Sequence, residues 1–255
     1  MEMKVKQAIV RGVPDTYQDC IKPDPNQTID LELVRLQHRA YCETLERLGV
    51  EVIRIEPDER FPDCCFVEDT AIVLGDTAII ARPAVESRSG EAAAVREVLG
   101  GRFKLIEIEA PGFIDGGDAL RIGDRLYIGV SGRTDRPAIG QVARAAERSG
   151  IEVIPVEIRD TLHLKTACTY IGNGFLVVNP GFFGPKEFSR YKTITVPPEE
   201  GYCANCLAVN GRVIIPGGHP RTRGMIEVAG FTVVELGMSE FKKGGGGLTC
   251  LSILF

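Results

Sequence analysis

The sequence has no excess of basic residues and no long apolar segment, and both absences limit what the chain does. Its 255 residues carry a formal net charge of −5, so it lacks the basic footprint of a nucleic-acid-binding domain. No apolar run reaches the roughly 18 residues that a membrane-spanning helix needs. The first residues, MEMKVKQAIVRG, lack the apolar stretch of a secretory signal. We therefore expect a cytoplasmic protein that binds neither nucleic acid nor membranes.

Cysteine and histidine are also scarce. Eight cysteines in 255 residues are far fewer than a disulfide scaffold contains. In a reducing compartment such cysteines are buried, bound to a metal or reactive, so each has to be considered separately. There are only three histidines. The composition is otherwise that of an ordinary globular protein, with 44% apolar and 25% charged residues.

A helix followed by a strand recurs along the chain. From Leu31 to Leu48, apolar residues return every three or four positions, which indicates a helix, and Gly49 is suited to end it. Residues 50–56 (VEVIRIE) then alternate as a strand does. Similar strands are predicted further on: FKLIEIE (103–109), IEVIPVEI (151–158), KTITV (192–196) and FTVVEL (231–236). The segment before KTITV is a poor helix, so that unit is weaker than the others.

Pairs of apolar runs lie between these units, and tight turns separate the runs. The turn signals are Gly75-Asp76, Gly123-Asp124, Asn173-Gly174 and Asn210-Gly211. Each unit is thus predicted to be a hairpin, a helix and a strand. One such unit cannot bury its own apolar face, so we expect one α/β domain over residues 1–255, made of about five ββαβ units in a ring.

The two ends of the chain each carry a strand without a local partner. KQAIVRG (6–12) and LTCLSILF (248–255) are both apolar enough to be buried strands. We expect them to pair with each other and to close the ring.

Polar segments precede the hairpins, where strands would not normally carry such residues. In a ring of this kind these segments should meet at the axis. They are PDCCFVED (62–69), IDGGD (114–118), TLHLKT (161–166) and GLTC (247–250).

Three residues in these segments are suited to nucleophilic catalysis. A lone free cysteine such as Cys250 is more often a small buried hydrophobe, and a lone histidine is more often part of the core. A run of glycines (244–247), however, precedes Cys250. The run is either a flexible linker or a backbone that approaches a ligand closely. A cysteine nucleophile needs a base and an orienting group, and His163 and Asp115 are the candidates.

Charged residues near these positions suggest a cationic substrate. Glu68 and Asp69 stand among apolar residues, so at least one points to a covered face, where an unpaired carboxylate is costly. No arginine adjoins them in sequence, so we expect a cationic ligand, and a guanidinium suits paired carboxylates. With Asp63, they would otherwise form a solvated turn. Arg88 and Arg133 would be surface charges or receptors for a substrate carboxylate.

At this point the segments resemble one family, dimethylarginine dimethylaminohydrolase. The resemblance is carried, in the family's order, by PDCCFVEDTAIV, ARP…SR (81–88), IDGGDAL, GRT (132–134), LHLKTACTY, ANCLAVNG and GLTCLSI. It implies the five-bladed ββαβ propeller, or pentein fold, of guanidine-modifying enzymes. It also implies hydrolysis of a methylated arginine to citrulline through a covalent S-alkylthiouronium intermediate.

The resemblance further implies a role for each matching residue. Catalysis would use Cys250 as nucleophile, His163 as general acid and base, and Asp115 as its carboxylate partner. The substrate would be held by Glu68 and Asp69 at the guanidinium, Asp63 at the α-ammonium, and Arg88 and Arg133 at the α-carboxylate. The family needs no metal or organic cofactor for turnover, so its partner is a small cationic guanidine substrate.

The chain departs from the family in two places. Many members carry an acidic residue five positions before the nucleophile, where this chain has Gly245. The segment after RGVPDTYQDC also diverges, and we expect it to cover the site as a mobile lid.

Other interpretations stay open at the level of sequence. A sister hydrolase would act on free arginine, as arginine deiminases do. A zinc protein would use Cys203 and Cys206 with Cys64 and Cys65, although the adjacent pair lacks the usual spacing. A non-catalytic ring is a third alternative. The oligomeric state is not determined, and a homodimer is among the open arrangements.

Overall fold

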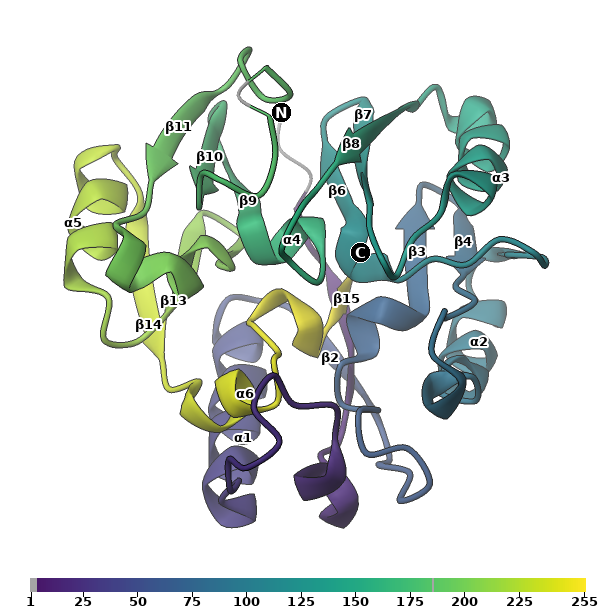
Figure 1. Ribbon diagram of the computed structural model, residues 1–255, viewed down its shortest axis with the longest axis horizontal. Helices are drawn as coiled ribbons and strands as arrows, with labels where there is room; N and C mark the ends of the chain where they lie inside the picture. The colour runs from purple at the N-terminus through teal and green to yellow at the C-terminus, as the bar shows by residue number, and fades with distance from the viewer. Residues whose placement is uncertain (1–3, 185) are drawn as a thin grey trace.

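The computed structural model of the chain describes residues 4–184 and 186–255. Within these residues it forms five three-stranded sheets, arranged in a ring around a central axis (Figure 1). In each sheet the middle strand pairs with one antiparallel and one parallel neighbour. This is the predicted architecture of repeated ββαβ units, and it is confirmed.

The strands are short, and their order in each sheet repeats the same pattern. The sheets are β15-β1-β2, β3-β4-β5, β6-β7-β8, β9-β10-β11 and β12-β13-β14. The bounds are β1 (Gln7–Arg11), β2 (Glu51–Ile55), β3 (Ala71–Leu74), β4 (Thr77–Ile80), β5 (Lys104–Glu107), β6 (Ala119–Ile122), β7 (Arg125–Val130), β8 (Glu152–Glu157), β9 (Cys168–Gly172), β10 (Phe175–Val178), β11 (Lys192–Thr195), β12 (Leu207–Val209), β13 (Arg212–Pro216), β14 (Thr232–Leu236) and β15 (Ile253–Leu254).

Helices connect the parallel strands on the outside of the ring (Figure 1). The connecting helices are α1 (Leu31–Arg47), α2 (Ala92–Gly100), α3 (Arg136–Ala146) and α5 (Pro220–Val228). Between β10 and β11 the described residues form turns instead, which agrees with the poor helix predicted there. Shorter helical segments are η1 (Asp15–Asp19), η2 (Val67–Thr70), η3 (Glu86–Arg88), η4 (Gly116–Asp118), η5 (Glu147–Ser149), α4 (Leu164–Ala167), η6 (Pro198–Ala204), α6 (Ser239–Lys243) and η7 (Thr249–Leu251).

Local sequence explains where the outer helices begin and end. Asp30 caps α1, because its carboxylate accepts a hydrogen bond from the Leu33 amide. Gly49 follows that helix with a φ of 79°, a left-handed conformation that glycine adopts without strain. In the Asn173-Gly174 turn both residues have positive φ, as the predicted two-residue hairpin requires.

The two ends of the chain close the ring. β1 pairs antiparallel with β15, with Ile9 opposite Ile253, so the predicted pairing is confirmed. The predicted strand over residues 248–255 is too long, because Thr249–Leu251 is a helical turn. The turn forms because the amides of Cys250 and Ser252 bond to carbonyls three residues earlier instead of to a strand. Cys250 therefore lies just before the closing strand and not on it.

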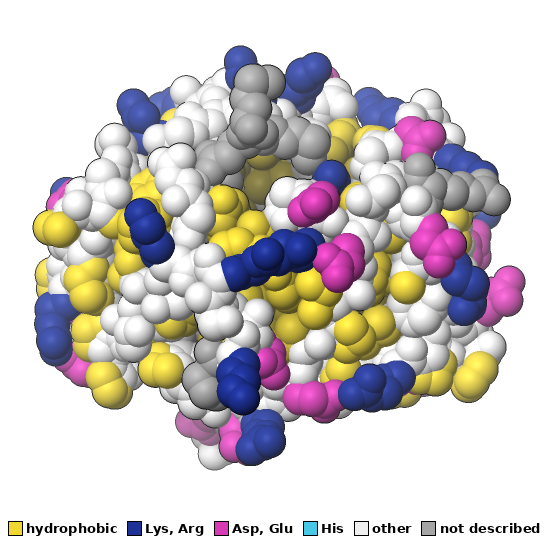
Figure 2. Space-filling view, turned by 90° about the horizontal axis from the view of Figure 1, so that it is seen from above, with side chains coloured by type: hydrophobic (Ala, Val, Ile, Leu, Met, Phe, Trp, Pro, Cys, Tyr) yellow, Lys and Arg dark blue, Asp and Glu magenta, His cyan; other side chains and the backbone are white. Residues whose placement is uncertain are grey.

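The surface carries charges of both signs. Figure 2 shows one face of the molecule, on which acidic and basic side chains lie interspersed among apolar ones. The described side chains on that face do not form a basic patch of the kind that binds nucleic acid. Among the described residues, no helix combines the length and the apolar character needed to cross a membrane.

Ring closure generates the first prediction. Ile253 is 5% exposed and packs in a cluster with Ile9, so Ile253→Ala should lower the free energy of unfolding by about 2–5 kcal/mol. Urea denaturation measures this loss. Val228, which is 90% exposed, provides the control, and Val228→Ala should change stability by less than about 0.5 kcal/mol. Equal effects of the two substitutions would contradict the closing role of β15.

Candidate active site

Short helical turns open four of the hairpins and meet one another. η2 precedes β3, η4 precedes β6, α4 precedes β9 and η7 precedes β15. Contacts join η2 to both η4 and η7, and α4 to η4. These turns belong to the four polar segments that the sequence predicted to gather at the axis. A further turn, η6, opens the fifth hairpin and contacts α4.

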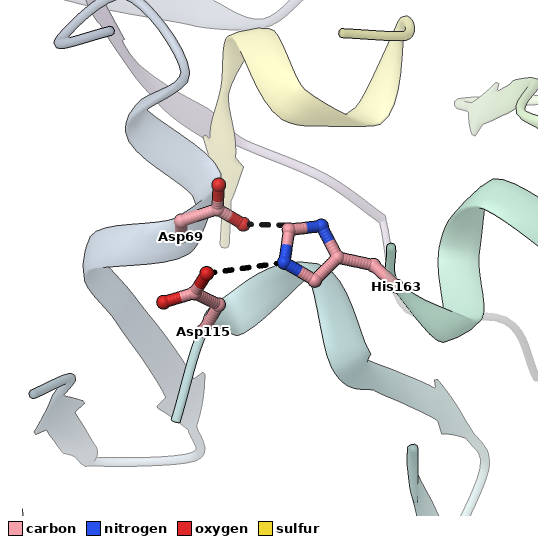
Figure 3. Close-up of side chains that lie close together, drawn as sticks. All are labelled: Asp69, Asp115 and His163. Carbon is pink, nitrogen blue, oxygen red and sulfur yellow. Dashed lines mark hydrogen bonds and ion pairs between the residues drawn. The ribbon is translucent and has the colours of Figure 1, made fainter. Parts of the chain in front are cut away.

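His163 lies between two buried carboxylates, Asp115 and Asp69 (Figure 3). Its Nε2 is 3.1 Å from Oδ2 of Asp115, and its Nδ1 is 3.9 Å from Oδ1 of Asp69. Burial alone would lower the pKa of His163, but these carboxylates together raise it to about 9. The imidazole is therefore a cation at neutral pH. The predicted pairing of His163 with Asp115 is present in the structure, and Asp69 is a second partner.

Glycine at position 117 allows these groups to lie so close. A Cβ atom there would be 2.7 Å from His163 Nδ1 and 2.8 Å from Asp69 Oδ1. Its amide also donates a hydrogen bond of 3.0 Å to Asp69. The tight approach expected at Gly116-Gly117 is thus observed, and a larger residue would push the imidazole and the carboxylate apart.

Protein cations already pair with the two neighbouring carboxylates. The Lys165 ammonium is 2.5 Å from Oε1 of Glu68, and Arg88 Nη1 is 2.7 Å from Oδ2 of Asp69. These acids thus have cationic partners within the protein, which their sequence neighbours did not indicate, and a cationic ligand at them stays a prediction. The partners stand 97 and 19 residues away in sequence, and only the fold brings them together.

Asp69 stays ionised in this environment. Burial by itself would raise the pKa of Asp69, but His163 and Arg88 outweigh it and lower the pKa to about 2. Burial raises the pKa of Glu68, and the Lys165 ammonium opposes that rise. The site is thus a set of alternating positive and negative charges, and little of its surface is exposed to water.

Arg88 is buried, and most of its donors are engaged. Its guanidinium bonds to both oxygens of Glu91, to Asp69 and to the Phe66 carbonyl. It helps to line a small pocket with Asp69 and Asp115. Arg133 is more open, and its Nη1 lies 3.5 Å from Oδ2 of Asp115. Of the two arginines, Arg133 has more donors free for a ligand.

The segment after β1 reaches the site at Asp63. Both carboxylate oxygens of this buried residue accept a hydrogen bond from the Ile21 amide, at 3.2 and 3.3 Å. Tyr17 anchors the same segment, because its ring packs edge-on against Phe66 at 5.8 Å. Burial raises the pKa of Asp63. Ile21, which begins the segment expected to form a lid, therefore contacts the site at Asp63, and the motion of that segment stays a prediction.

Cys250 lies in η7 and is half-buried. Its sulfur accepts a hydrogen bond of 3.3 Å from the Gly247 amide. In the described part of the chain, no hydrogen bond joins it to His163. Burial, together with the charges of Glu68 and Asp69, raises the pKa of the Cys250 thiol to about 12. In the empty site the thiol is therefore neutral.

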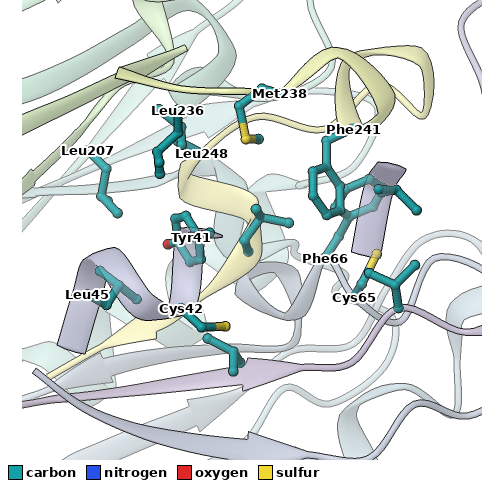
Figure 4. Packing of buried hydrophobic residues seen from close by; sticks show 14 of the residues in the cluster. Tyr41, Cys42, Leu45, Cys65, Phe66, Leu207, Leu236, Met238, Phe241 and Leu248 are labelled. Carbon is teal, nitrogen blue, oxygen red and sulfur yellow. The ribbon is translucent and has the colours of Figure 1, made fainter. Parts of the chain in front are cut away.

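The glycine run before Cys250 makes room for side chains. A Cβ atom on Gly246 would be 2.1 Å from the Phe66 ring, and one on Gly247 would be 2.5 Å from Asn205. Phe66 belongs to the apolar cluster around Leu248 (Figure 4). The run is consequently a packed segment and not a flexible linker, and the close approach of its backbone to a ligand stays a prediction.

Several residues around the site were not predicted from the sequence. Glu91 pairs with Arg88, Lys165 pairs with Glu68, and Asp118 accepts a hydrogen bond of 2.8 Å from the Leu164 amide, next to His163. For two of these residues the sequence contained a feature that could have indicated them. Asp118 repeats Asp69 at an interval of 49 residues, and Lys165 stands within the polar segment TLHLKT.

The thiols proposed as zinc ligands do not form a site. Cys203 and Cys206 pack in one hydrophobic cluster, and Cys65 packs in another. Among the described residues, Asp69, Asp115 and His163 do bring potential ligand atoms within 4.8 Å of one another. The imidazolium, with Arg88 on Asp69 and Arg133 on Asp115, already offsets these carboxylates, so we assign the group as an ion-pair network and not as a metal centre.

Comparison with known proteins identifies similar chains. The family model for N,N dimethylarginine dimethylhydrolase, eukaryotic, matches residues 11–253. The chain is 39% identical to an N(G),N(G)-dimethylarginine dimethylaminohydrolase from Pseudomonas aeruginosa, over 98% of this chain and 96% of the relative. It is 33% identical to the protein of the same name from Streptomyces coelicolor, over 98% and 97%.

Solved structures agree with these sequence matches. The dimethylarginine dimethylaminohydrolase of Pseudomonas aeruginosa, a cysteine-to-serine mutant complexed with citrulline, superposes with a TM-score of 0.96. The sequences are 36% identical, and the match covers 99% of this chain and 100% of the other. The N-terminal domain of ArgZ, an arginine dihydrolase from cyanobacteria, has the same fold with a TM-score of 0.90 at 23% identity.

The ion-pair network leads to a prediction about His163. Replacing Asp69 by Asn removes the largest charge that raises the pKa of the imidazole, so this pKa should fall from about 9. An NMR titration of the His163 ring protons measures the change. Glu107→Gln, on the exposed end of β5, should leave the titration unaltered. A pKa that stays near 9 in Asp69→Asn would mean that Asp69 does not control the imidazole.

Proposed function

The chain belongs to the dimethylarginine dimethylaminohydrolase family, and from this we propose that it hydrolyses Nω,Nω-dimethyl-L-arginine to L-citrulline and dimethylamine. Monomethyl-L-arginine would give citrulline and methylamine. Four turns meet near the axis of the ring and bring together a thiol, an imidazolium and buried carboxylates. This observation carries the proposal. This set of groups suits attack on the carbon of a bound cation.

Substrate binding uses the charges around the turns. The guanidinium binds Glu68 and Asp69, whose oxygens accept its forked N–H donors. The α-ammonium binds Asp63, and the α-carboxylate binds Arg133 and Arg88. Because Ile21 donates to the same Asp63 carboxylate, the lid and the α-ammonium share one receptor. Binding of the amino acid end therefore helps to hold the lid in place.

The substrate itself activates the nucleophile. In the empty site, the pKa of Cys250 is raised by burial and by Glu68 and Asp69, the two acids that hold the guanidinium. A bound cation offsets their charges, so the thiol gives up its proton to solvent and the thiolate is stabilised. The thiolate then attacks the guanidinium carbon to form a tetrahedral adduct. The lack of a hydrogen bond between Cys250 and His163 is consistent with a reacting group lying between them.

His163 moves the protons in both halves of the reaction. As an imidazolium it protonates the departing nitrogen, and dimethylamine leaves from the adduct. The neutral imidazole then takes a proton from water, which attacks the S-alkylthiouronium carbon. The C–S bond of this second adduct breaks, its hydroxyl proton passes to the departing Cys250 sulfur, and citrulline is released with the thiol and the imidazolium restored. Asp115 and Asp69 keep the ring oriented between the two steps.

We also propose that the enzyme works in the cytoplasm. All eight cysteines are free thiols, which fits a reducing compartment. A homodimer stays a prediction.

Kinetics with three substrates test the proposed activity. We expect citrulline formation from dimethylarginine to exceed that from free arginine in kcat/KM, with monomethylarginine also accepted. Two methyl groups distinguish the competing substrates, and about 1–3 kcal/mol per methylene-sized change is the usual discrimination. Cys250→Ala serves as the control and should make no citrulline. Faster turnover of plain arginine would instead identify an arginine deiminase, and an active Cys250→Ala enzyme would exclude the proposed nucleophile.

Alkylation tests the activation of the thiol. Because the pKa of Cys250 is about 12 in the empty site, iodoacetamide should react slowly at pH 7 and faster as the pH rises towards that value. Glu68→Gln removes one of the charges that raise this pKa, so alkylation at pH 7 should become faster. Mass spectrometry locates the label on Cys250. Rapid alkylation of the wild-type thiol at pH 7 would show that the free enzyme already holds a thiolate.

A further inference from the structure

Asn205 is a buried amide at the end of η6 that takes no part in the scheme above. It is 4% exposed and makes three hydrogen bonds. Its Oδ1 accepts from the Thr249 amide at 3.0 Å, and its Nδ2 donates to Thr249 Oγ1 and to the Lys165 carbonyl, both at 3.0 Å. Every one of these partners lies on a turn that carries a reacting residue.

The two turns that Asn205 joins belong to different units of the ring. Thr249 directly precedes Cys250 in η7, and Lys165 follows His163 by two residues in α4. Among the described residues, no hydrogen bond joins Cys250 directly to His163. One side chain from a third unit thus spans the nucleophile turn and the acid–base turn.

Glu68 makes a second bridge between the same two turns. Its Oε1 accepts from the Lys165 ammonium at 2.5 Å, and its Oε2 accepts from Thr249 Oγ1 at 2.8 Å. Glu68 is also a substrate contact in the proposed function, so its bridge changes when the guanidinium binds. Asn205 is not a substrate contact in the proposed function. Its hydrogen bonds to the two turns can therefore stay unchanged through the reaction.

The chemistry of the bridge is specific for an amide. At this point one group has to accept from a backbone N–H and donate to both a hydroxyl and a carbonyl, and of the side chains of this size only Asn does both. Gly247 leaves the space for it, because a Cβ there would be 2.5 Å from the Asn205 side chain. The glycine before the nucleophile and the amide opposite it therefore fit as a pair.

We propose that Asn205 is a positioning residue of the hydrolase, which sets the distance between the Cys250 thiol and the His163 imidazole by holding η7 and α4 together. This inference rests on the proposed function. Attack by the thiol and protonation of the departing amine occur on the same carbon centre. Both groups must therefore reach the substrate at once, and a displacement of about 1 Å can cost about 100-fold in rate.

Asn205→Ala tests the proposal, and Asn210→Ala is its matched control. Asn210 also makes three side-chain bonds, accepting from the Val5 amide and donating to the carbonyls of Val5 and Leu48, but it lies in the β12–β13 turn. For Asn205→Ala we expect kcat to fall about 100-fold with little change in KM. For Asn210→Ala we expect a lower melting temperature but an unchanged kcat per active site.

Folded enzyme is quantified by circular dichroism and size-exclusion chromatography, so that unfolded enzyme does not lower the apparent kcat per active site. If Asn205→Ala does not fold, Thr249→Val removes the hydroxyl that Asn205 holds, and Thr249→Ser restores it. We then expect Thr249→Val to lose most of its kcat and Thr249→Ser to recover most of that loss.

Two outcomes would overturn the inference. One is a kcat per active site that Asn205→Ala and Asn210→Ala lower equally, and the other is a Thr249→Val enzyme that keeps the wild-type kcat. Wild-type turnover of dimethylarginine is measured in the same assay. If the wild type makes no citrulline, the proposed function fails; if it does and kcat is insensitive to Asn205, only the positioning role fails.

Discussion

Buried charges at the centre of the ring have to neutralise one another, and the arrangement of the site follows from that requirement. An isolated carboxylate in the interior would be far more costly than a paired one. Asp69 is therefore bonded to Arg88 and faces His163, and Glu68 is bonded to Lys165 and Thr249. Each pair joins different turns. The pairing of these buried charges thus also fixes the positions of the reacting groups.

This arrangement also sets the protonation of two of the reacting groups. The imidazole is charged, because Asp69, Asp115 and Asp118 outweigh burial and raise the pKa of His163 to about 9. The thiol is neutral, because burial, Glu68 and Asp69 raise the pKa of Cys250 to about 12. In the proposed function a bound guanidinium offsets Glu68 and Asp69, so the thiolate would form mainly in the presence of a cationic substrate.

The repeat and the location of the site could be read from the sequence because both depend on local patterns. Apolar spacing indicated the outer helices, Asn-Gly pairs indicated the turns, and polar segments at the hairpin starts indicated where chemistry would gather. The sequence did not indicate which side chains from different units would pair. Lys165 meets Glu68 across 97 residues, and Asn205 meets Thr249 across 44, and no spacing rule reports such contacts. The length of the last strand was misjudged for a related reason, because apolar residues suit a buried helical turn as well as a strand.

The closing pair of strands has a consequence for how activity is lost. β15 pairs with β1 through only two residue pairs, and the turn just before β15 carries Cys250. Separation of these two strands would displace the thiol while the other four sheets stay paired. Partial opening at this seam therefore removes activity before most of the fold is lost.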